Sequence, residues 1–173
     1  MICRQLLRRR PQSRCAFSLL EVSISALITG VLLVAAMRTL GASLRSGLET
    51  SDRSRADLLA QDLMAEVLSM AYVEPTETIV FGPETSETGD TRALFDDVDD
   101  FHNWDESPPT YPDGTVIPNF AAWRRTVVVQ NVKISDLTQL ASPAEGVKRI
   151  TVNVQRNGVT IATLTAARSD NDL

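Results

Sequence analysis

The first regular feature of the chain is an almost uninterrupted apolar run. Residues 17–37 read FSLLEVSISALITGVLLVAAM, and Glu21 is the one charged side chain in these 21 positions. A helix of about 20 apolar residues is long enough to cross the hydrocarbon core of a bilayer. The pattern therefore predicts a membrane-spanning helix over residues 17–37.

Beyond Met37 the apolar positions continue at steps of three or four residues, which is the spacing of one helix face. They are Leu40, Leu44, Leu48, Leu59, Leu63, Val67 and Met70. Proline is absent from residues 17–72, so we predict one long helix with a transmembrane half, 17–37, and an amphipathic half, 38–72. Its charged residues Asp52, Arg53, Arg55, Asp57, Asp62 and Glu66 are expected to form a face exposed to solvent.

Residues 73–119 are acidic and contain several prolines, which predicts a variable region of irregular loops. Residues 120–173 instead read as antiparallel sheet, with β-rich runs at 123–132, 147–156 and 159–167. Asn157-Gly158 predicts a two-residue hairpin turn that places Val154 opposite Ile161. The expected fold is α+β, one long N-terminal helix packed on a small antiparallel sheet of three or four strands.

Charge is distributed unevenly along the chain. Residues 1–16 carry five arginines and no acidic side chain, so the rest of the chain has 12 basic and 22 acidic residues, a formal net charge of −10. Basic residues before a spanning helix favour a cytoplasmic N-terminus, and the acidic remainder disfavours nucleic-acid binding. Both cysteines, Cys3 and Cys15, lie in this basic leader, so a chain that loses the leader has no thiol.

The junction between leader and helix carries a specific motif. Ala16 to Val22, AFSLLEV, resembles the cleavage and methylation motif of type IV prepilins, where glycine usually precedes the cleavage site. Two alternatives are weaker. A secretory signal peptide cleaved near Ala36 conflicts with the helical continuation through Arg38, and a lipoprotein anchor at Cys15 conflicts with Arg14 directly before it.

The resemblance to the type IV pilin and pseudopilin family implies a definite biochemistry. A prepilin peptidase would cut between Ala16 and Phe17, and the new amino group of Phe17 would be methylated. Glu21 would then pair with the N-terminal amine of a neighbouring subunit, which provides the partner that a carboxylate in an apolar environment requires. Implied partners are other pilin or pseudopilin subunits and an inner-membrane assembly platform. The precursor would be a single-pass inner-membrane protein, and the product a periplasmic or extracellular filament.

The segment FDDVDDFHNW, residues 95–104, concentrates four aspartates between aromatic residues. Asp96, Asp97, Asp99 and Asp100 are calcium candidates, although their spacing is not that of an EF-hand. The favoured interpretation is a surface loop that Phe95, Val98, Phe101 and Trp104 attach to the core while the aspartates face water. The stretch also resembles minor pilins of the mannose-sensitive haemagglutinin pilus, of the MshD-like kind, which implies a low-abundance subunit.

Catalysis is not expected, and neither is a cofactor other than calcium. A carboxylate pair such as Asp97 and Asp100, or a base at His102, would lie on a loop rather than on rigid elements. Trp104, Trp123 and Tyr111 fit either a binding surface or the core. The leading prediction is a minor pilin. A minor pseudopilin of type II secretion and a monomeric, membrane-anchored binding protein or adhesin are the alternatives.

Overall fold

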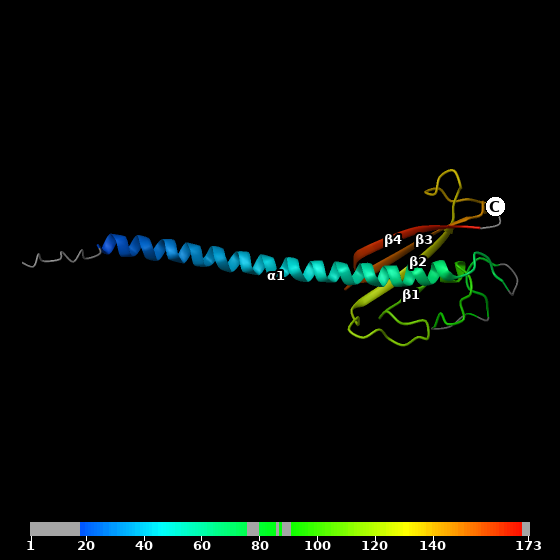
Figure 1. Cartoon of the computed structure of the whole chain (residues 1–173), viewed down its shortest axis with the longest axis horizontal. Helices are drawn as coiled ribbons and strands as arrows, with labels where there is room; N and C mark the ends of the chain where they lie inside the picture. The colour runs from blue at the N-terminus through cyan, green and yellow to red at the C-terminus, as the bar shows by residue number, and fades with distance from the viewer. Residues whose placement is uncertain (1–17, 76–79, 86, 88–90, 171–173) are drawn as a thin grey trace, which may run out of the picture. The chain divides into compact units, whose positions relative to one another are not determined.

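The computed structural model describes residues 18–75, 80–85, 87 and 91–170 (Figure 1). It contains the helix α1 (Leu19–Ser69), a short 3-10 helix η1 (Asp99–Phe101) and the strands β1 (Asp105–Glu106), β2 (Trp123–Asn131), β3 (Val147–Arg156) and β4 (Val159–Ser169). The strands form one antiparallel sheet in the order β1-β2-β3-β4. The predicted pilin-like architecture, a long N-terminal helix packed on a small antiparallel sheet, is confirmed, and β1 comes from the region predicted to be loop.

Helix α1 starts close to the predicted position and ends three residues early. The Ser18 hydroxyl accepts a hydrogen bond from the Glu21 amide at 3.2 Å and so caps the first turn. At the other end, the Ala71 amide donates to the Asp96 carbonyl and the Val98 amide donates to the Ala71 carbonyl, both at 3.0 Å. The helix thus ends where a distant segment binds the backbone of the chain. No local sequence signal at Ser69 predicts this end.

The chain divides into two compact units, residues 1–47 and 48–173. In the first unit every described residue is exposed, from Ser18 to Gly47. Burial on α1 starts at Ala56, and six residues at helical spacing form its core face: Ala56, Leu59, Ala60, Leu63, Met64 and Val67. The predicted apolar stripe is therefore correct for Leu59, Leu63 and Val67, whereas Leu40, Leu44 and Leu48 are exposed.

The core of the second unit joins α1 to the sheet and to the acidic segment. Alternate residues of β2 and β3 face α1, among them Val127, Val129, Ile150, Val152 and Val154, all without solvent exposure. Phe95, Val98 and Phe101 enter the same cluster. The alternation that places Ile150, Val152 and Val154 on one face of residues 147–156 correctly predicts the buried face of β3; for β2 the sequence predicted a strand without naming its buried face.

The β3–β4 hairpin corrects the predicted register. Asn157 and Gly158 both have positive φ, 51° and 78°, as a type I′ turn requires. A bulge follows in β4, because Gln155 pairs with Thr160 while Val154 pairs with Ala162 rather than with Ile161. The extra residue shifts the strand by one position, so Leu164 rather than Thr163 lies opposite Val152.

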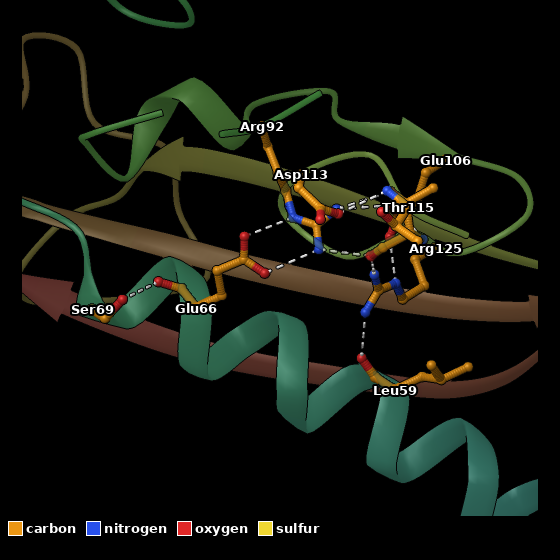
Figure 2. Close-up of polar contacts among 9 residues, drawn as sticks. Leu59, Glu66, Ser69, Arg92, Glu106, Asp113, Thr115 and Arg125 are labelled. Atoms are coloured by element: carbon orange, nitrogen blue, oxygen red, sulfur yellow. Dashed lines mark hydrogen bonds and ion pairs between the residues drawn. The ribbon is translucent and has the colours of Figure 1, made fainter. Parts of the chain in front are cut away.

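A buried network of charged side chains connects the loop region to α1 (Figure 2). The Arg92 guanidinium donates two hydrogen bonds to the Glu66 carboxylate, at 2.7 and 3.1 Å, and one to Glu106 at 3.0 Å. The Arg92 side chain is 2% exposed and that of Glu106 4%. The prediction that Glu66 belongs to a solvated face is therefore wrong, because Arg92 reaches it from a loop 26 residues away.

Arg125 of β2 completes this network. Its guanidinium forms an ion pair with Glu106 and donates to the carbonyl oxygens of Leu59, at 3.3 Å, and Thr110, at 2.7 Å. Glu106 also accepts the amide of Thr110 at 3.0 Å. Two arginines and two glutamates thus share their charges and link α1, the loops, β1 and β2.

We expect Arg92→Met to destabilise the protein by about 3–5 kcal/mol, because the buried carboxylate of Glu106 and the partly buried carboxylate of Glu66 would both lose this cation. Denaturant unfolding of the full-length protein in detergent micelles measures this through the fluorescence of Trp104 and Trp123. The matched control is Arg124→Met, since Arg124 pairs with Asp105 while its side chain is 49% exposed. Equal losses of stability in the two variants would contradict the importance of the buried network.

Candidate functional site

The N-terminal half of α1 is an apolar surface with one carboxylate. Its large side chains between Leu19 and Leu44 are all at least half exposed, and the helix is long and apolar enough to cross a membrane. Glu21 lies in the first turn, where the positive end of the helix dipole favours a negative charge. The amide of Glu21 is satisfied by Ser18, but no described cation forms an ion pair with its carboxylate.

Three hydroxyl groups of this half are satisfied within the helix. Ser23 donates to the Leu19 carbonyl at 2.9 Å, Thr29 to that of Ser25 at 2.7 Å, and Thr39 to that of Ala35 at 2.9 Å. Hydroxyl groups that bond to their own helix backbone can enter an apolar environment without loss of hydrogen bonds. Glu21 is the one charged group between Ser18 and Met37. Ala16, Phe17 and the leader 1–16 lie outside the described residues.

The acidic segment attaches to the core as predicted, but its aspartates do not face water. Phe95 contacts Phe101 with ring centroids 5.0 Å apart, and also contacts Trp104 at 5.4 Å. Asp97, Asp99 and Asp100 are only 2–4% exposed. The expectation of a solvated acidic face is wrong, because these carboxylates bind backbone amides and other side chains of the second unit, residues 48–173, which we call the head.

Asp97 and Asp100 bind the backbone of their own segment. Asp97 Oδ1 accepts the amides of Asp99, at 2.6 Å, and Asp100, at 3.3 Å. In return, Asp100 Oδ2 accepts the amides of Asp96 and Asp97 at 3.0 and 2.9 Å. The carboxylate pair, for which the sequence does not favour catalysis, is thus engaged in backbone hydrogen bonds, which fix the turn of η1.

Asp99 and His102 have other partners. Asp99 forms an ion pair with Lys148 of β3 and accepts the Gly82 amide at 3.2 Å. His102 Nδ1 accepts the amide of Val129 at 3.3 Å. Asp99 and Lys148 line a cavity of about 190 Å³, which is smaller than the usual range for small-molecule sites, about 300–1,000 Å³.

Five carboxylates from three places in the loop region lie close together, and two of them belong to the acidic segment, residues 95–104. Glu74, Glu84 and Glu87 bring one oxygen each to within 4.8 Å of one another, and so do Glu87, Asp96 and Asp100. Glu87 belongs to both groups and is therefore central to the acidic cluster, as we call these five residues. Of the four predicted calcium candidates, the structure places Asp96 and Asp100 in the cluster and gives Asp97 and Asp99 other partners.

The acidic cluster perturbs the ionisation of its members. Burial raises the pKa of Glu87 to about 8, and the adjoining carboxyl groups of Asp100 and Glu84 add to the effect. Burial also raises the pKa of Asp96, to which the charges of Glu74 and Asp100 add. Asp97 nearby has its pKa raised to about 7, by burial and then by Asp99, against the effect of Lys148. This arrangement favours the binding of a cation by carboxylate oxygens.

Sequence reasoning missed the three glutamates. Glu74, Glu84 and Glu87 are spread along the loop region, and nothing in their spacing resembles a ligand motif. The acidic excess of residues 73–115 against the single Arg92 was the available signal, because so many carboxylates in a small head cannot all avoid one another. Among the aromatic candidates, Trp123 is buried, Trp104 is packed at the edge of the core and Tyr111 is 49% exposed.

Comparison of the chain with protein-family models, with curated proteins and with solved structures found no match.

We expect the metal-free protein to lose stability as the pH rises from about 4.5 to about 8. In this window the unfolded chain ionises Glu87, whose ordinary pKa is 4.5, while the folded protein keeps it protonated up to about 8. Ionisation is thus linked to unfolding, and Asp97 acts in the same direction. Denaturant unfolding at several pH values in chelator-treated buffer measures the effect.

Glu87→Gln should remove most of this pH dependence, because an amide stays neutral throughout. Glu49→Gln, at an exposed position of α1, should retain it. A free energy of unfolding that rises between pH 5 and 8 in the unaltered protein would contradict the assignment.

Proposed function

We propose that the chain is a type IV pilin-like subunit of the minor-pilin kind, anchored in the inner membrane as a precursor and then assembled into a filament. The observation that carries the proposal is the single helix α1. Its first part exposes apolar side chains with one carboxylate near the start, and its last part packs on the head. A prepilin peptidase would cut between Ala16 and Phe17, and the amine of Phe17 would be methylated.

Glu21 gives the proposal its physical basis. A carboxylate near the centre of a bilayer costs roughly 2.5–3.5 kcal/mol, and less near the interface. Ser18 bonds the amide of Glu21 rather than its carboxylate, so the cap leaves the charge uncompensated. A methylated amine at Phe17 of a neighbouring subunit would compensate that charge. Because an amine meets Glu21 only when helices lie at one offset, the pair would also set the register between subunits.

A minor pseudopilin of type II secretion would use the same helix and the same pair, so the two assemblies share this mechanism. A membrane-anchored monomer would use the apolar surface for lipid contact alone, and would have no need of a carboxylate at position 21. The presence of Glu21 favours an assembling subunit.

Processing has a direct test. We expect the protein purified from membranes to begin at Phe17, with one added methyl group on its α-amine. Mass spectrometry of the intact protein and of its N-terminal peptide measures both changes. An N-terminus at Met1, or one near Ala36, would contradict the proposal.

Assembly has a separate test. We expect Glu21→Ala to abolish incorporation into filaments while the processed protein still accumulates in the membrane, because the neighbour's amine loses its partner. Sheared filament fractions and membrane fractions are compared by immunoblot. Glu49→Ala, an exposed glutamate further along α1, serves as the control and should assemble normally. Normal incorporation of Glu21→Ala would favour the monomeric alternative.

A further inference from the structure

The acidic cluster contains buried oxygen atoms that lack partners. Neither carboxylate oxygen of Glu84 accepts a hydrogen bond from the described residues, although Glu84 is only 8% exposed. Asp100 is 2% exposed, and its Oδ1 is likewise without a donor, as is Oδ1 of Asp96. Buried polar atoms are nearly always satisfied in proteins, since each unsatisfied one costs about 1–3 kcal/mol and more when charged.

These oxygens belong to the two groups that Glu87 shares. Glu84 offers an oxygen to the group with Glu74 and Glu87, and Asp100 offers one to the group with Glu87 and Asp96. Asp100 is held firmly, because its Oδ2 accepts two backbone amides while Oδ1 is left for the cluster. A ligand would therefore meet a carboxylate whose position the fold already fixes.

The nearby cations are committed elsewhere. Lys148 pairs with Asp99 and lies 4.5 Å from the centre of the Tyr72 ring. Arg92 pairs with Glu66 and Glu106. Within the described part of the chain, no lysine or arginine forms an ion pair with Glu84, Glu87 or Asp100. The charge of the cluster is therefore lowered either by protonation of Glu87 or by a cation from solution.

We propose that the acidic cluster binds calcium, with Glu87 as the ligand that the two groups share, Asp96 and Asp100 as ligands in one group, and Glu74 and Glu84 as ligands in the other. The donors are all carboxylate oxygens, which suit a hard cation. Oxygens that share one Ca²⁺ at about 2.4 Å can lie up to about 4.8 Å apart, and the two groups meet this limit. Mg²⁺ binds at about 2.1 Å and demands near-octahedral ligands, so it suits a loop-built cluster less well.

Calcium here would hold three separate parts of the loop region together. The ligands come from position 74, from positions 84 and 87, and from positions 96 and 100, and Asp100 adjoins Phe101 in the core. Binding would replace repulsion between buried carboxylates with shared coordination, and so stabilise the head.

The test is a calcium titration of the full-length protein in detergent micelles after removal of divalent ions with a chelator. Isothermal titration calorimetry with CaCl₂ should show saturable binding, and Tm from tryptophan fluorescence should rise. The expected rise is on the order of 10 °C when free Ca²⁺ exceeds Kd a hundredfold. MgCl₂ at equal concentration should give a much smaller shift.

Two variants assign the effect to the cluster. Glu87→Gln should abolish the calcium-dependent rise in Tm, while its metal-free Tm at pH 8 should equal or exceed that of the unaltered protein. Glu84→Gln provides a second variant, because the native Glu84 oxygens make no hydrogen bond that glutamine could lose. Glu49→Gln, at an exposed position, should respond to calcium normally.

Three results would overturn the proposal: no heat and no change in Tm at millimolar CaCl₂, an undiminished calcium response in both variants, or an equal response to MgCl₂. The measurements use the protein alone and do not involve assembly, so the calcium site and the pilin function can fail independently.

Discussion

Two arginines and two glutamates, buried where the helix, the loops and the sheet meet, hold the head together. Arg92 binds Glu66 of α1 through both carboxylate oxygens and reaches Glu106 of β1, while Arg125 of β2 binds Glu106 and the backbone of Leu59. Removing charges from water is costly, and only close pairing with full hydrogen bonding offsets that cost. The network therefore tolerates one arrangement of these elements, and the loop region is fixed by it.

The fixed loops determine where the acidic residues lie. Along the chain, Arg92 stands between the glutamates of the loop and the segment that starts at Phe95, and Phe95 and Phe101 anchor that segment in the core. Asp97 and Asp100 then exchange hydrogen bonds with the backbone around η1, and this leaves one oxygen of Asp100 for the group with Glu87. The arginine network and the acidic cluster differ in how their charges are compensated. The arginine network is balanced internally, while the carboxylates of the cluster depend on protonation or on a cation from solution.

The first unit follows a different rule. Its described side chains, from Ser18 to Gly47, are exposed in the isolated chain, and the helix is long and apolar enough to cross a membrane. Glu21 is the one charged side chain in the apolar part of this surface, from Ser18 to Met37, where a buried charge would be costly. The head depends on interactions that the chain supplies to itself, whereas the N-terminal half of α1 depends on its surroundings.

Local patterns along the sequence determined the helix, its apolar first half, the buried face of β3 and the Asn157-Gly158 turn. Each follows from periodicity, or from the backbone preference of one or two residues. Tertiary structure alone decided the rest. The end of α1 at Ser69, the bulge in β4, the pairing of Glu66 with Arg92, the burial of Asp97, Asp99 and Asp100, and the meeting of Glu87 with Asp100 all depend on contacts between residues that are not neighbours in the sequence. A carboxylate looks the same in sequence whether water, an arginine or another carboxylate lies beside it. Its neighbours, which only the fold brings together, set its cost and its chemistry.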